Sequence, residues 1–526
     1  MAKIKTSVLF KNYNQQQSLL LPPTLDELIE IKHLVRVVNE VVDAMDITSL
    51  INQYEGGGTT AYHPRMLLKV LLYAYCMKIY TGRKIAKALK QDIHFMWLAA
   101  MNRPDFRTIN NFRSGKAKEV IEELFKEMLL FLIDHEYVKM ENYFCDGSSF
   151  AADANRHKMI WRKNAERYKE ATEKKCKELF KQIDALNAAD DNWYGDKDLE
   201  ETGNQTLASI NQETIAAQVD KLNKVMERAT AKKQKRKAVS LKKQLEKNQD
   251  NITKYEHQLK TAGKRSGYNR TDKDATAMRM KNDETLPAYN ILAGSENQFI
   301  VNCSAHQSTN DGACFKEHME QLEKHSDLLP GAVMADSIFG TEENYELLEN
   351  KNINNYLKFP SFYKEGKKSY QNNPFLKDNF IYDGSTDTYT CPNDQLLILT
   401  QITTQTHKRT GYKSALKIYA CENCSGCPFY AECCRAQTEK NRIIKVNENL
   451  EAYKQQARKN LKSEKGITLR KQRGVEIESC FGDIKHNMGF RRFHLRGIEK
   501  VKAEWSIVAM AHNLKKIHLQ NIKKAA

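Results

Sequence analysis

The chain has 526 residues, of which 41% are hydrophobic and 28% are charged, and its formal net charge is +17. This length exceeds one ordinary hydrophobic core, so we expect two to four modules. No apolar run approaches the length of a membrane span, and the N-terminus lacks the apolar core of a secretory signal, which argues against a membrane-spanning or exported protein. So large a surplus of lysine and arginine favours a polyanionic partner, although a solvated surface explains any single basic run better.

Residues 1–135 are predicted to form a helical module. Apolar residues recur at roughly helical spacing from Leu25 onward, and Pro64 begins an apolar helix in a favoured first-turn position. A basic amphipathic helix is expected from Thr81, and a turn at Pro104 leads into a further helix. Short helices joined by tight turns suit a helix-turn-helix-like DNA-binding module, and an ordinary all-helical packing domain explains them equally well.

The segment after this module changes character twice. Residues 136–160 contain the run 143–146, which is typical of a strand ending in an acid. Residues 161–268 are poor in glycine and proline, and their apolar residues follow the four- and three-residue steps of a coiled-coil seam. An interruption at residues 188–196 divides this segment into two arms, so we expect an antiparallel coiled-coil hairpin inserted into another domain. Its basic stretch at residues 232–237 suits DNA, but a solvated helix face explains that stretch better when it is taken alone. The seam residues are Ile215, Val219, Leu222, Met226, Ala229, Leu241, Leu245, Ile252, Tyr255 and Leu259.

Residues 269–373 return to the pattern of strands followed by helices, which predicts a mixed α/β sheet. Apolar runs beginning at Leu286 and Gln298 are typical of paired strands, and residues 331–336 form an apolar strand that runs into an acid. Helices are expected at residues 315–328 and 342–351, a strand at 353–359, short strands with cysteines at 374–445, and a helical C-terminal part at 446–526 whose last helix covers about 496–522.

Three acidic residues that lie far apart in the sequence are candidate metal ligands. Asp146 and Asp336 each end an apolar run, and Glu478 lies on a predicted helix. Phosphodiesters resist hydrolysis because their negative charge repels nucleophiles, and two divalent ions about 4 Å apart overcome this barrier. Mg²⁺ prefers carboxylate oxygens and keeps several waters, so a few acidic side chains suffice. On spacing alone, strand-end or helix-cap carboxylates explain the three acids better.

Local motifs surround each of these acids. The first is DGSS at residues 146–149, followed by Asn155, Arg156 and Trp161; the second is ADSIFG at 335–340; the third and most specific is IESCFGDIK at 477–485. Further phrases stand at residues 33–36, 62–73 and 104–113. Together these motifs resemble the DDE transposases of bacterial insertion sequences, of the cut-and-paste class with an RNase H-like catalytic domain. The resemblance runs nearly from end to end of the chain.

The resemblance also implies roles for single residues. In the family the acid precedes Phe-Gly by two intervening residues, which selects Glu478; Glu476 lies about 200° around a helix from it. Lys485 lies seven residues after Glu478, which is about two turns along the same helical face. Relatives often place an arginine four residues before the glutamate, where this chain has Gly474, with Arg473 one residue earlier.

Cationic residues near these motifs are predicted to contact DNA phosphates. They are Arg65, Arg156, Arg473, Lys485, Arg491, Arg492 and Arg496. A solvated helix face explains Arg473 about as well as DNA binding does, and it explains Lys485 less well. Phe490, Phe493 and Trp161 are candidates for stacking on displaced bases, with core packing as the competing explanation, and we expect at least one of the phenylalanines in the core.

Six cysteines between Asp336 and Glu478 are too dense to be chance core thiols. They are Cys391, Cys421, Cys424, Cys427, Cys433 and Cys434. Because Cys-x-x-Cys turns present two thiolates to one tetrahedral ion, a structural Zn²⁺ held by four of the six is the natural prediction. An iron–sulfur cluster is a weaker alternative, and unmetallated reduced thiols are the third. The segment stands where the resembling family carries an insertion.

The expected fold class is α/β, with an RNase H-like mixed-sheet catalytic domain. Its parts are residues 136–160, 269–373 and 446–526; the helical module precedes it, and the coiled-coil hairpin at 161–268 and a small cysteine-rich β insertion at 374–445 interrupt it.

The resemblance implies a DNA transposase that binds terminal inverted repeats, cleaves at the transposon ends and joins the 3′-hydroxyl ends to target DNA. Two Mg²⁺ ions, or Mn²⁺, would be held by Asp146, Asp336 and Glu478. Because transposition joins two ends, a homodimer on DNA is expected, in the bacterial cytoplasm at the nucleoid. A nuclease of the same fold and a catalytically idle DNA-binding protein are the alternatives.

Overall fold

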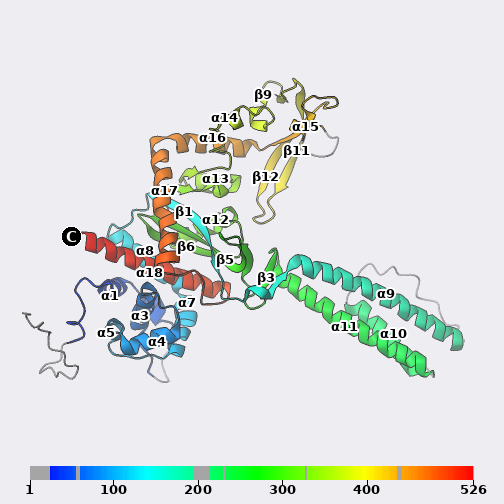
Figure 1. The fold of residues 1–526 in the computed structure, drawn as a ribbon, viewed down its shortest axis with the longest axis horizontal. Coiled ribbons are helices and arrows are strands. Elements are labelled where there is room, and N and C mark those ends of the chain that lie inside the picture. Colours follow the sequence, from blue (N-terminus) through cyan, green and yellow to red (C-terminus); the bar gives the residue numbers. More distant parts are fainter. Residues whose placement is uncertain are drawn as a thin grey trace, which may run out of the picture. The chain divides into compact units, whose positions relative to one another are not determined.

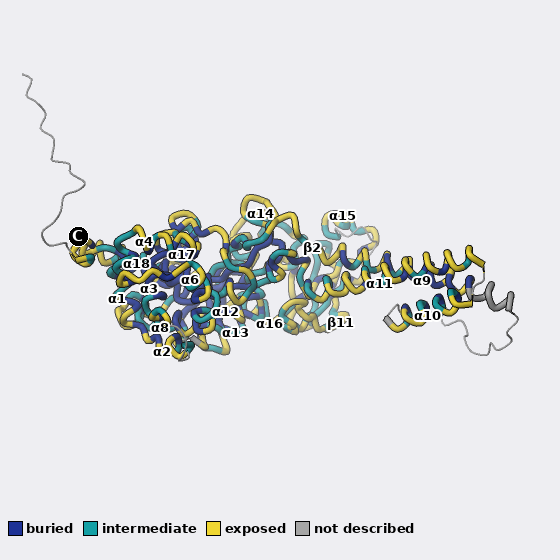
Figure 2. The backbone as a smooth tube through the Cα atoms, turned by 90° about the horizontal axis from the view of Figure 1, so that it is seen from below, coloured by how far each residue is buried: buried dark blue, intermediate teal, exposed yellow. Residues whose placement is uncertain are grey.

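The computed structural model divides the chain into two compact units, which are residues 1–119 with 514–526, and residues 120–513. It describes residues 24–54, 60–194, 212–228, 231–325, 328–434 and 441–524. Figure 1 shows the path of the chain through its helices and strands, and Figure 2 shows which parts of the backbone are buried. In the described part of the chain, no helix is both long enough and apolar enough to cross a membrane.

The first unit is helical, as the sequence predicts. Its apolar centre is α3, where every residue from Leu67 to Cys76 is buried. Polar side chains cap the helices at the predicted turns: Thr81 accepts from the backbone N–H of Lys84, and Asp105 accepts from that of Thr108 at 2.8 Å. The elements are α1 (Leu34–Ala44), α2 (Thr48–Ile51), α3 (Pro64–Cys76), α4 (Gly82–Gln91), α5 (Ile93–Leu98), α6 (Phe106–Asn111), a π-helical turn (Phe112–Lys116), α7 (Ala117–Glu119) and the end of α18 (Ile498–Lys524).

The second unit is built on a mixed sheet with the strand order β4-β5-β1-β7-β8, in which β6 also pairs with β5. β5 runs antiparallel to β1, β4 and β6, whereas β7 is parallel to β1 and β8 is parallel to β7. This arrangement confirms the predicted mixed α/β sheet. The strands are β1 (Asn142–Ala151), β4 (Thr276–Arg279), β5 (Thr285–Glu296), β6 (Phe299–His306), β7 (Ala332–Ala335) and β8 (Asn354–Leu357).

β1 is longer than the sequence pattern predicts, because it continues past Asp146 to Ala151. Its parallel pairing with β7 ends at Cys145, opposite Ala335, whereas its antiparallel pairing with β5 runs on to Ala151. The prediction of a strand that ends at the acid is therefore wrong for the strand, and the acid instead marks the point where one of two neighbouring strands stops. Asp336 directly follows the end of β7, as predicted.

The start of β1 is held by a buried carboxylate. Glu296, at the end of β5, accepts hydrogen bonds from the backbone N–H groups of four successive residues at distances of 2.6–3.0 Å. Four charge-assisted hydrogen bonds to one carboxylate fix the entry of the chain into the sheet, because each would cost free energy if it were left unmade in the interior. The four donors are Lys139, Met140, Glu141 and Asn142.

Helices from the C-terminal part of the chain pack on the even-numbered side chains of β1. The ring centroid of Phe150 lies 5.2 Å from that of Trp505 on α18 and 6.2 Å from that of Phe481 on α17. Phe490 and Phe493 join this aromatic core and are only 1% and 0% exposed. Neither ring is available to a base, so the stacking hypothesis is wrong for both, because the core needs their apolar area. The helices of this unit are α8 (Ile121–Asp134), α12 (Phe315–His325), α13 (Glu342–Asn350), α16 (Glu448–Lys462), α17 (Glu464–Gly482), a π-helical turn (Asp483–Asn487) and the first part of α18.

Among the described residues, the insertion between β1 and β4 holds three helices, one more than the predicted two arms. They are α9 (Arg162–Tyr194), α10 (Gln212–Arg228) and α11 (Lys232–Ala262), joined to the sheet by the short pair β2 (Met159–Trp161) and β3 (Gly267–Asn269). α9 continues without a break as far as Tyr194, so the predicted interruption does not begin at residue 188; residue 196 and Ala229 lie outside the described residues. Seam residues of α10 and α11, including Leu222, Leu241 and Leu245, are buried with Ile183 of α9, which confirms this part of the predicted seam, whereas Tyr255 and Leu259 are half-buried and lie outside the cluster.

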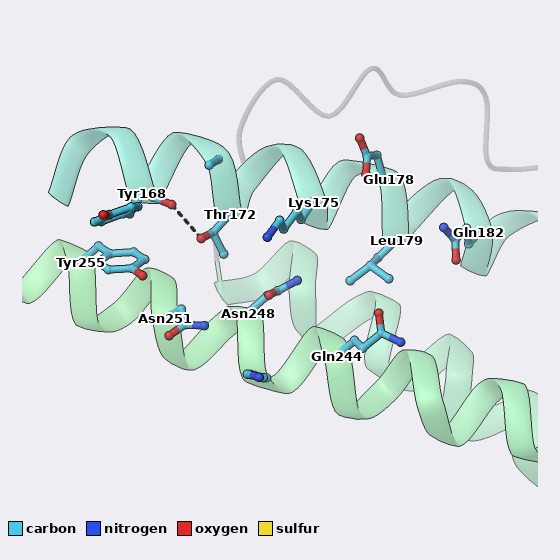
Figure 3. A pocket seen from close by; sticks show the side chains of 12 residues that line it. Tyr168, Thr172, Lys175, Glu178, Leu179, Gln182, Gln244, Asn248, Asn251 and Tyr255 are labelled. Carbon is cyan, nitrogen blue, oxygen red and sulfur yellow. Dashed lines mark hydrogen bonds between the residues drawn. The ribbon is translucent and has the colours of Figure 1, made fainter. Parts of the chain in front are cut away.

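The part of the hairpin between α9 and α11 contains a groove with a mainly polar lining. Figure 3 shows amide and charged side chains from both helices facing this groove, with Tyr168 and Tyr255 side by side at one end. Their ring centroids are 6.0 Å apart. The groove residues include Thr172, Lys175 and Asn248. The two long helices therefore bury apolar area mainly where α10 joins them.

The cysteine-rich segment forms a separate five-stranded antiparallel sheet with the order β13-β12-β11-β10-β9. Its small core contains Leu397, Tyr419 and Ile444. The strands are β9 (Ile381–Asp383), β10 (Thr388–Thr390), β11 (Leu396–Thr406), β12 (Lys413–Cys421) and β13 (Ile443–Val446), with the short helices α14 (Lys368–Gln371) and α15 (Tyr430–Cys433) beside them.

Candidate active site

The three predicted acids come together around one guanidinium group. The Nη1 atom of Arg473 lies 2.9 Å from Glu478 Oε1, and its Nη2 atom lies 3.1 Å from Asp146 Oδ2 and 4.0 Å from Asp336 Oδ2. Asp146 is supplied by β1, Asp336 by the residue after β7, and Glu478 by α17. Residues separated by hundreds of positions thus converge at the edge of the sheet where the parallel strands end.

Arg473 reaches the acids because it occupies an apolar position of α17. The buried face of this helix includes Leu469, Arg473 and Ile477 at four-residue steps, and the arginine is only 8% exposed. Its Nε atom is buried without a hydrogen-bond partner. Gly474, where relatives of the resembling family carry arginine, presents no side chain, and a Cβ built on it would lie 4.0 Å from Glu478 Oε2.

The carboxylates differ in exposure and environment. The side chain of Asp146 is 21% exposed, whereas those of Asp336 and Glu478 are 48% and 54% exposed. Burial raises the pKa of Asp146 above its usual value, and the neighbouring guanidinium of Arg473 opposes that rise. Lys358, a buried cation that the sequence motifs did not single out, lies 3.8 Å from Asp336 Oδ1.

Glu476, the alternative acid, points elsewhere. Its carboxylate accepts a hydrogen bond of 2.6 Å from the backbone N–H of Gln298, in the turn between β5 and β6. Glu476 therefore helps to dock α17 on the sheet, whereas Glu478 faces the other two acids.

Lys485 lies on the same side of β1 as Asp146. Its ammonium group donates to Ser148 Oγ at 2.6 Å and to the carbonyl oxygen of Ser149 at 3.1 Å, and it lies 4.4 Å from the centroid of the Phe150 ring. The pKa of Lys485 is lowered to about 8, mainly by burial and also by repulsion from Lys281, whereas Asp146 acts in the opposite direction. The lysine lies in the π-helical turn that follows α17, and such turns are frequent at functional sites.

The remaining predicted cations fall into two groups. Arg492 and Arg496 both pair with Asp153, just beyond the end of β1, and keep side chains that are 53% and 55% exposed. Arg491 is also exposed and donates to the carbonyl oxygen of Lys485 at 3.1 Å. These three arginines follow the third motif and border the side of β1 that carries the acids.

Arg156 and Arg65 are placed differently. Arg156 is 59% exposed, and its Nη1 atom lies 3.9 Å from a carboxylate oxygen of Glu284. Arg65 donates to the carbonyl oxygens of Val42, Asp43 and Met45 at the C-terminal end of α1. Because its guanidinium satisfies carbonyl groups that α1 leaves unpaired, Arg65 has a structural use inside the helical unit.

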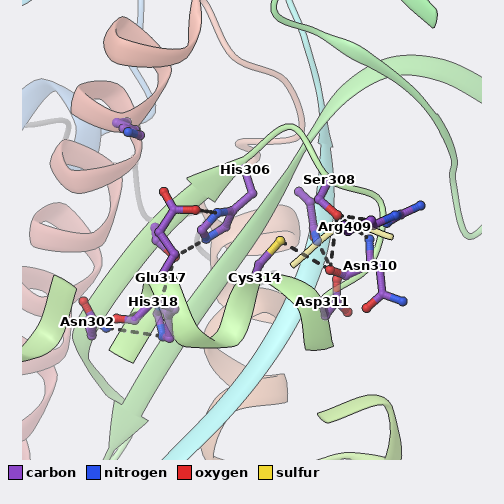
Figure 4. A network of polar contacts seen from close by, with 12 residues as sticks. Asn302, His306, Ser308, Asn310, Asp311, Cys314, Glu317, His318 and Arg409 are labelled. Atoms are coloured by element: carbon purple, nitrogen blue, oxygen red, sulfur yellow. Dashed lines mark hydrogen bonds and ion pairs between the residues drawn. The ribbon is translucent and has the colours of Figure 1, made fainter. Parts of the chain in front are cut away.

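A buried polar network lies on the opposite face of β1 and was not predicted from the sequence. The hydroxyl of Tyr143 lies 2.7 Å from Nε2 of His318, whose Nδ1 lies 2.7 Å from Ser304 Oγ, which in turn lies 2.7 Å from Nε2 of His306. Nδ1 of His306 lies 3.2 Å from Glu317 (Figure 4). Burial, with a smaller contribution from His306, lowers the pKa of His318 to about 3, so its imidazole is neutral.

Asp311 is a further acid close to the site that sequence reasoning missed. A Cβ built on Gly147 would lie 2.5 Å from the Asp311 carboxyl carbon, so the carboxylate rests against the backbone next to Asp146. Asn290 of β5 donates to Asp311 Oδ1 at 2.6 Å, and burial raises the pKa of Asp311. The signal was the glycine after Asp146, which leaves room for this carboxylate.

The cysteines of the β insertion lie near one another. Cys421 and Cys424 belong to its small core, and Cys391 and Cys433 pack against it. Backbone N–H groups donate to two sulfur atoms, from Asn393 to Cys391 Sγ at 3.4 Å and from Arg442 to Cys424 Sγ at 3.3 Å. Among the residues that the structure describes, however, no group of three or more histidine, cysteine, aspartate or glutamate side chains is arranged to hold a metal ion.

Comparisons with known families match two parts of the chain. The model of the transposase DDE domain matches residues 390–518, which include Glu478, Lys485 and the six cysteines, and the model of a transposase domain (DUF772) matches residues 23–115 in the helical unit. Asp146 and Asp336 lie outside both matches. No curated protein and no solved structure matches the chain.

Proposed function

Because the chain belongs to the DDE transposases of insertion sequences, we propose that it cleaves DNA at the ends of its element and joins those ends to target DNA. The observation that carries this proposal is the convergence of Asp146, Asp336 and Glu478 on one point at the edge of the sheet. Asp153, another acid near this edge, is paired with arginines and is not assigned to the cluster.

We propose an RNase H-like fold for the catalytic unit. The central order β6-β5-β1-β7-β8, in which β5 runs antiparallel to β1 whereas β6, β7 and β8 run parallel to it, supports this assignment. In this arrangement β1 and β7 lie side by side, and Asp146 directly follows the last pair of residues that joins them, so it meets Asp336, which directly follows β7. The helix that brings Glu478 then covers the same edge.

The family's DDE domain generally uses a divalent metal, and the chemistry of the three acids fits Mg²⁺ or Mn²⁺. All three donors are carboxylates, and a cationic group of the protein already lies among them. When bound there, two divalent ions would activate the attacking oxygen and stabilise the departing one. Asp146 is held most rigidly, since it lies within a paired strand and is the least exposed of the three.

In the proposed reaction, water attacks a phosphorus atom at the transposon end and the bond to the 3′-oxygen breaks, which leaves a free 3′-hydroxyl. That hydroxyl loses its proton to solvent and attacks a phosphorus atom of the target, whose own 3′-oxygen leaves. One phosphodiester bond replaces another, so no further energy source is required. Lys485 and the exposed arginines 491, 492 and 496 would bind the neighbouring phosphates as cations.

The helical unit is proposed to bind the terminal inverted repeats. Its α4 presents Arg83, Lys84, Lys87 and Lys90 as exposed side chains, and the helix contains no acid. Gly82 at its start lets α6 approach closely, since a Cβ there would lie 2.5 Å from Asn110 Oδ1. Because two ends are joined, a homodimer on DNA is proposed as the working form, in the bacterial cytoplasm.

A structural Zn²⁺ in the β insertion is proposed separately. The sulfur atoms of Cys391 and Cys424 already accept backbone hydrogen bonds, and soft sulfur donors suit zinc. The metal content of purified protein, compared with that of Cys424→Ser, tests this assignment. A zinc-free wild-type protein would favour reduced thiols.

Cleavage and strand transfer on DNA that carries the element's own ends test the proposed function, in the presence of Mg²⁺. Wild type is expected to cut and join, and Glu478→Gln to bind the same DNA without doing either. Glu476→Gln is the matched control, since its carboxylate faces Gln298 and its loss should leave the chemistry in place. Cutting without joining would indicate a nuclease, and binding without cutting would indicate an idle DNA-binding protein.

A further inference from the structure

We propose that the guanidinium of Arg473 takes the place of the divalent ions in the metal-free protein and has to leave the three carboxylates before the ions bind. The inference rests on the proposed function, because it takes Asp146, Asp336 and Glu478 as the metal-binding group. Arg473 is then a positioning residue that lowers the affinity of the empty site for metal and keeps the three acids together until metal arrives.

The contacts of Arg473 are those expected of a substitute cation. Two nitrogen atoms of one planar group lie 2.9 Å from Glu478 and 3.1 Å from Asp146, and the second of them is also 4.0 Å from Asp336. Three carboxylates without a cation would repel one another in this half-buried place. A single guanidinium offsets part of that repulsion, because it is always charged and presents donors in a fixed fork.

The guanidinium contacts oxygen atoms of the same carboxylates that divalent ions would need. Mg²⁺ requires oxygen ligands at about 2.0–2.1 Å in near-octahedral geometry. The guanidinium instead spaces the carboxylate oxygens around its own nitrogen atoms at about hydrogen-bond distance. The described side chains contain no group that is already arranged to hold a metal ion, although the chemistry of the three carboxylates suits one.

The burial of Arg473 bears on how readily it gives up its contacts with the three acids. Its side chain is 10% exposed, and its Nε–H group has no partner in the structure. A buried donor without a partner costs roughly 1–3 kcal/mol, so the guanidinium is held by its three acids and not by a complete set of hydrogen bonds. Divalent ions that bind the three carboxylates therefore remove the contacts that hold the guanidinium in place.

A phosphate of bound DNA is the natural second partner for the released group. Arginine binds phosphate through two parallel hydrogen bonds, much as it binds carboxylate. Gly474 beside it carries no side chain, and a Cβ there would have Glu478 Oε2 as its nearest neighbour, at 4.0 Å. The contacts between Arg473 and the three acids would thus be replaced by two new ones: metal would bind the acids, and a phosphate would bind the arginine.

Binding of Mn²⁺ to the full-length, DNA-free protein tests the inference by titration calorimetry and by the electron paramagnetic resonance signal of free Mn²⁺. Arg473→Gln is expected to bind Mn²⁺ about tenfold more tightly than wild type, and Arg473→Lys, which keeps a cation, to fall between the two. Arg492→Gln is the matched control: it removes the same charge near the site, but its partner is Asp153, so its Mn²⁺ affinity should stay within about twofold of wild type.

Thermal unfolding supplies a second measurement that does not depend on activity. Without metal, Arg473→Gln should unfold at a lower temperature than wild type, and Mn²⁺ should raise its unfolding temperature by more, since binding to the folded state alone stabilises it in proportion to affinity. A merely structural arginine would lower the unfolding temperature equally with and without metal.

Two results would overturn the inference, and they differ in what else they remove. If Asp146→Asn abolishes Mn²⁺ binding while Arg473→Gln binds as wild type does or more weakly, Arg473 does not compete with metal, and the proposed function still stands. If neither wild type nor Arg473→Gln binds Mn²⁺, the metal-binding assignment of the three acids fails together with the inference.

Discussion

The two faces of β1 carry opposite kinds of chemistry although they share one backbone. On the even-numbered face, Asp146 and Ser148 meet the cations Arg473 and Lys485, and the group is partly open to solvent. On the odd-numbered face, Tyr143 is fully buried against a neutral imidazole. Strand alternation separates the charged group from the neutral network by a single residue. A polar group is stable on either face, but on the even-numbered face it needs a nearby cation and on the odd-numbered face it needs a hydrogen-bond partner.

The two faces of β1 would not differ in this way if an acid on the odd-numbered face were as important for DNA cleavage as Asp146. Asp146→Asn is expected to lower DNA cleavage by about 10³-fold or more, because it removes charge from the group proposed to bind metal. Asp311→Asn, whose carboxylate rests on Gly147 from the other side, should lower cleavage by less than about tenfold. Cleavage rates at saturating DNA and Mg²⁺ measure both effects, and equal losses would place Asp311 in the catalytic group.

A stability measurement tests how tightly the odd-numbered face of β1 is packed. A Cβ built on Gly294 of β5 would lie 1.8 Å from the ring of Tyr143, which is fully buried and cannot move aside. Gly294→Ala is therefore expected to destabilise the catalytic unit by about 1–3 kcal/mol, which is typical of overpacking, and to lower its thermal midpoint.

The control for this substitution is a glycine near the acids. Gly474→Ala adds a methyl group inside a helix, where its nearest neighbour would be Glu478 Oε2 at 4.0 Å. It should therefore stabilise the protein by about 0.5–1 kcal/mol and raise the thermal midpoint slightly. An unchanged midpoint for Gly294→Ala would mean that the odd-numbered face is packed less tightly than the structure has it.

The smallest expected effect concerns pH on the even-numbered face. The pKa of Lys485 lies near 8, below its usual value, so the side chain is charged below pH 8 and loses its charge as the pH rises through 8. Affinity for DNA ends should therefore fall above pH 8 in wild type by up to about tenfold, which is the contribution of one charge-assisted phosphate contact. Binding measured from pH 6.5 to 9.5 should show no such fall in Lys485→Gln.

Lys281→Gln gives this titration an internal check. Repulsion from Lys281 is one cause of the lowered pKa of Lys485, so removing it should move the fall in affinity to higher pH. A fall at the same pH in all three proteins would assign the titration to another group.

Most elements of the fold follow from local sequence patterns. The strand before Asp336 is a short apolar run, and the strands from Leu286 and Gln298 alternate and pair as neighbours do. Two features could not be predicted from local patterns because they depend on partners far away in the sequence. β1 extends beyond Asp146 only because β5 continues beside it, and the insertion gains a third helix, α10, on a seam that two helices also explain.

At the candidate site, the motifs were sufficient to select the three acids and Lys485, but not the place of Arg473. Its departure by one residue from the family pattern left a solvated helix face and DNA binding as about equally good explanations. The contrary signal was available in the four-residue step from Leu469 through Arg473 to Ile477, which puts the arginine on the apolar stripe of the helix. Arg65 escaped for a different reason, since its use on the carbonyl groups of α1 depends on how two helices meet.

The stem of the helical insertion has a consequence for how the chain tolerates change. β2 and β3 pair so that Trp161 lies opposite Gly267, and the backbone N–H of Arg162 donates to the carbonyl oxygen of Ser266 at 2.9 Å. The insertion therefore leaves and re-enters the sheet at adjacent points, and closing its ends costs little extra entropy whatever length of chain lies between them. Helices can therefore be lengthened, shortened or exchanged at this junction over evolution without moving the strand that carries Asp146.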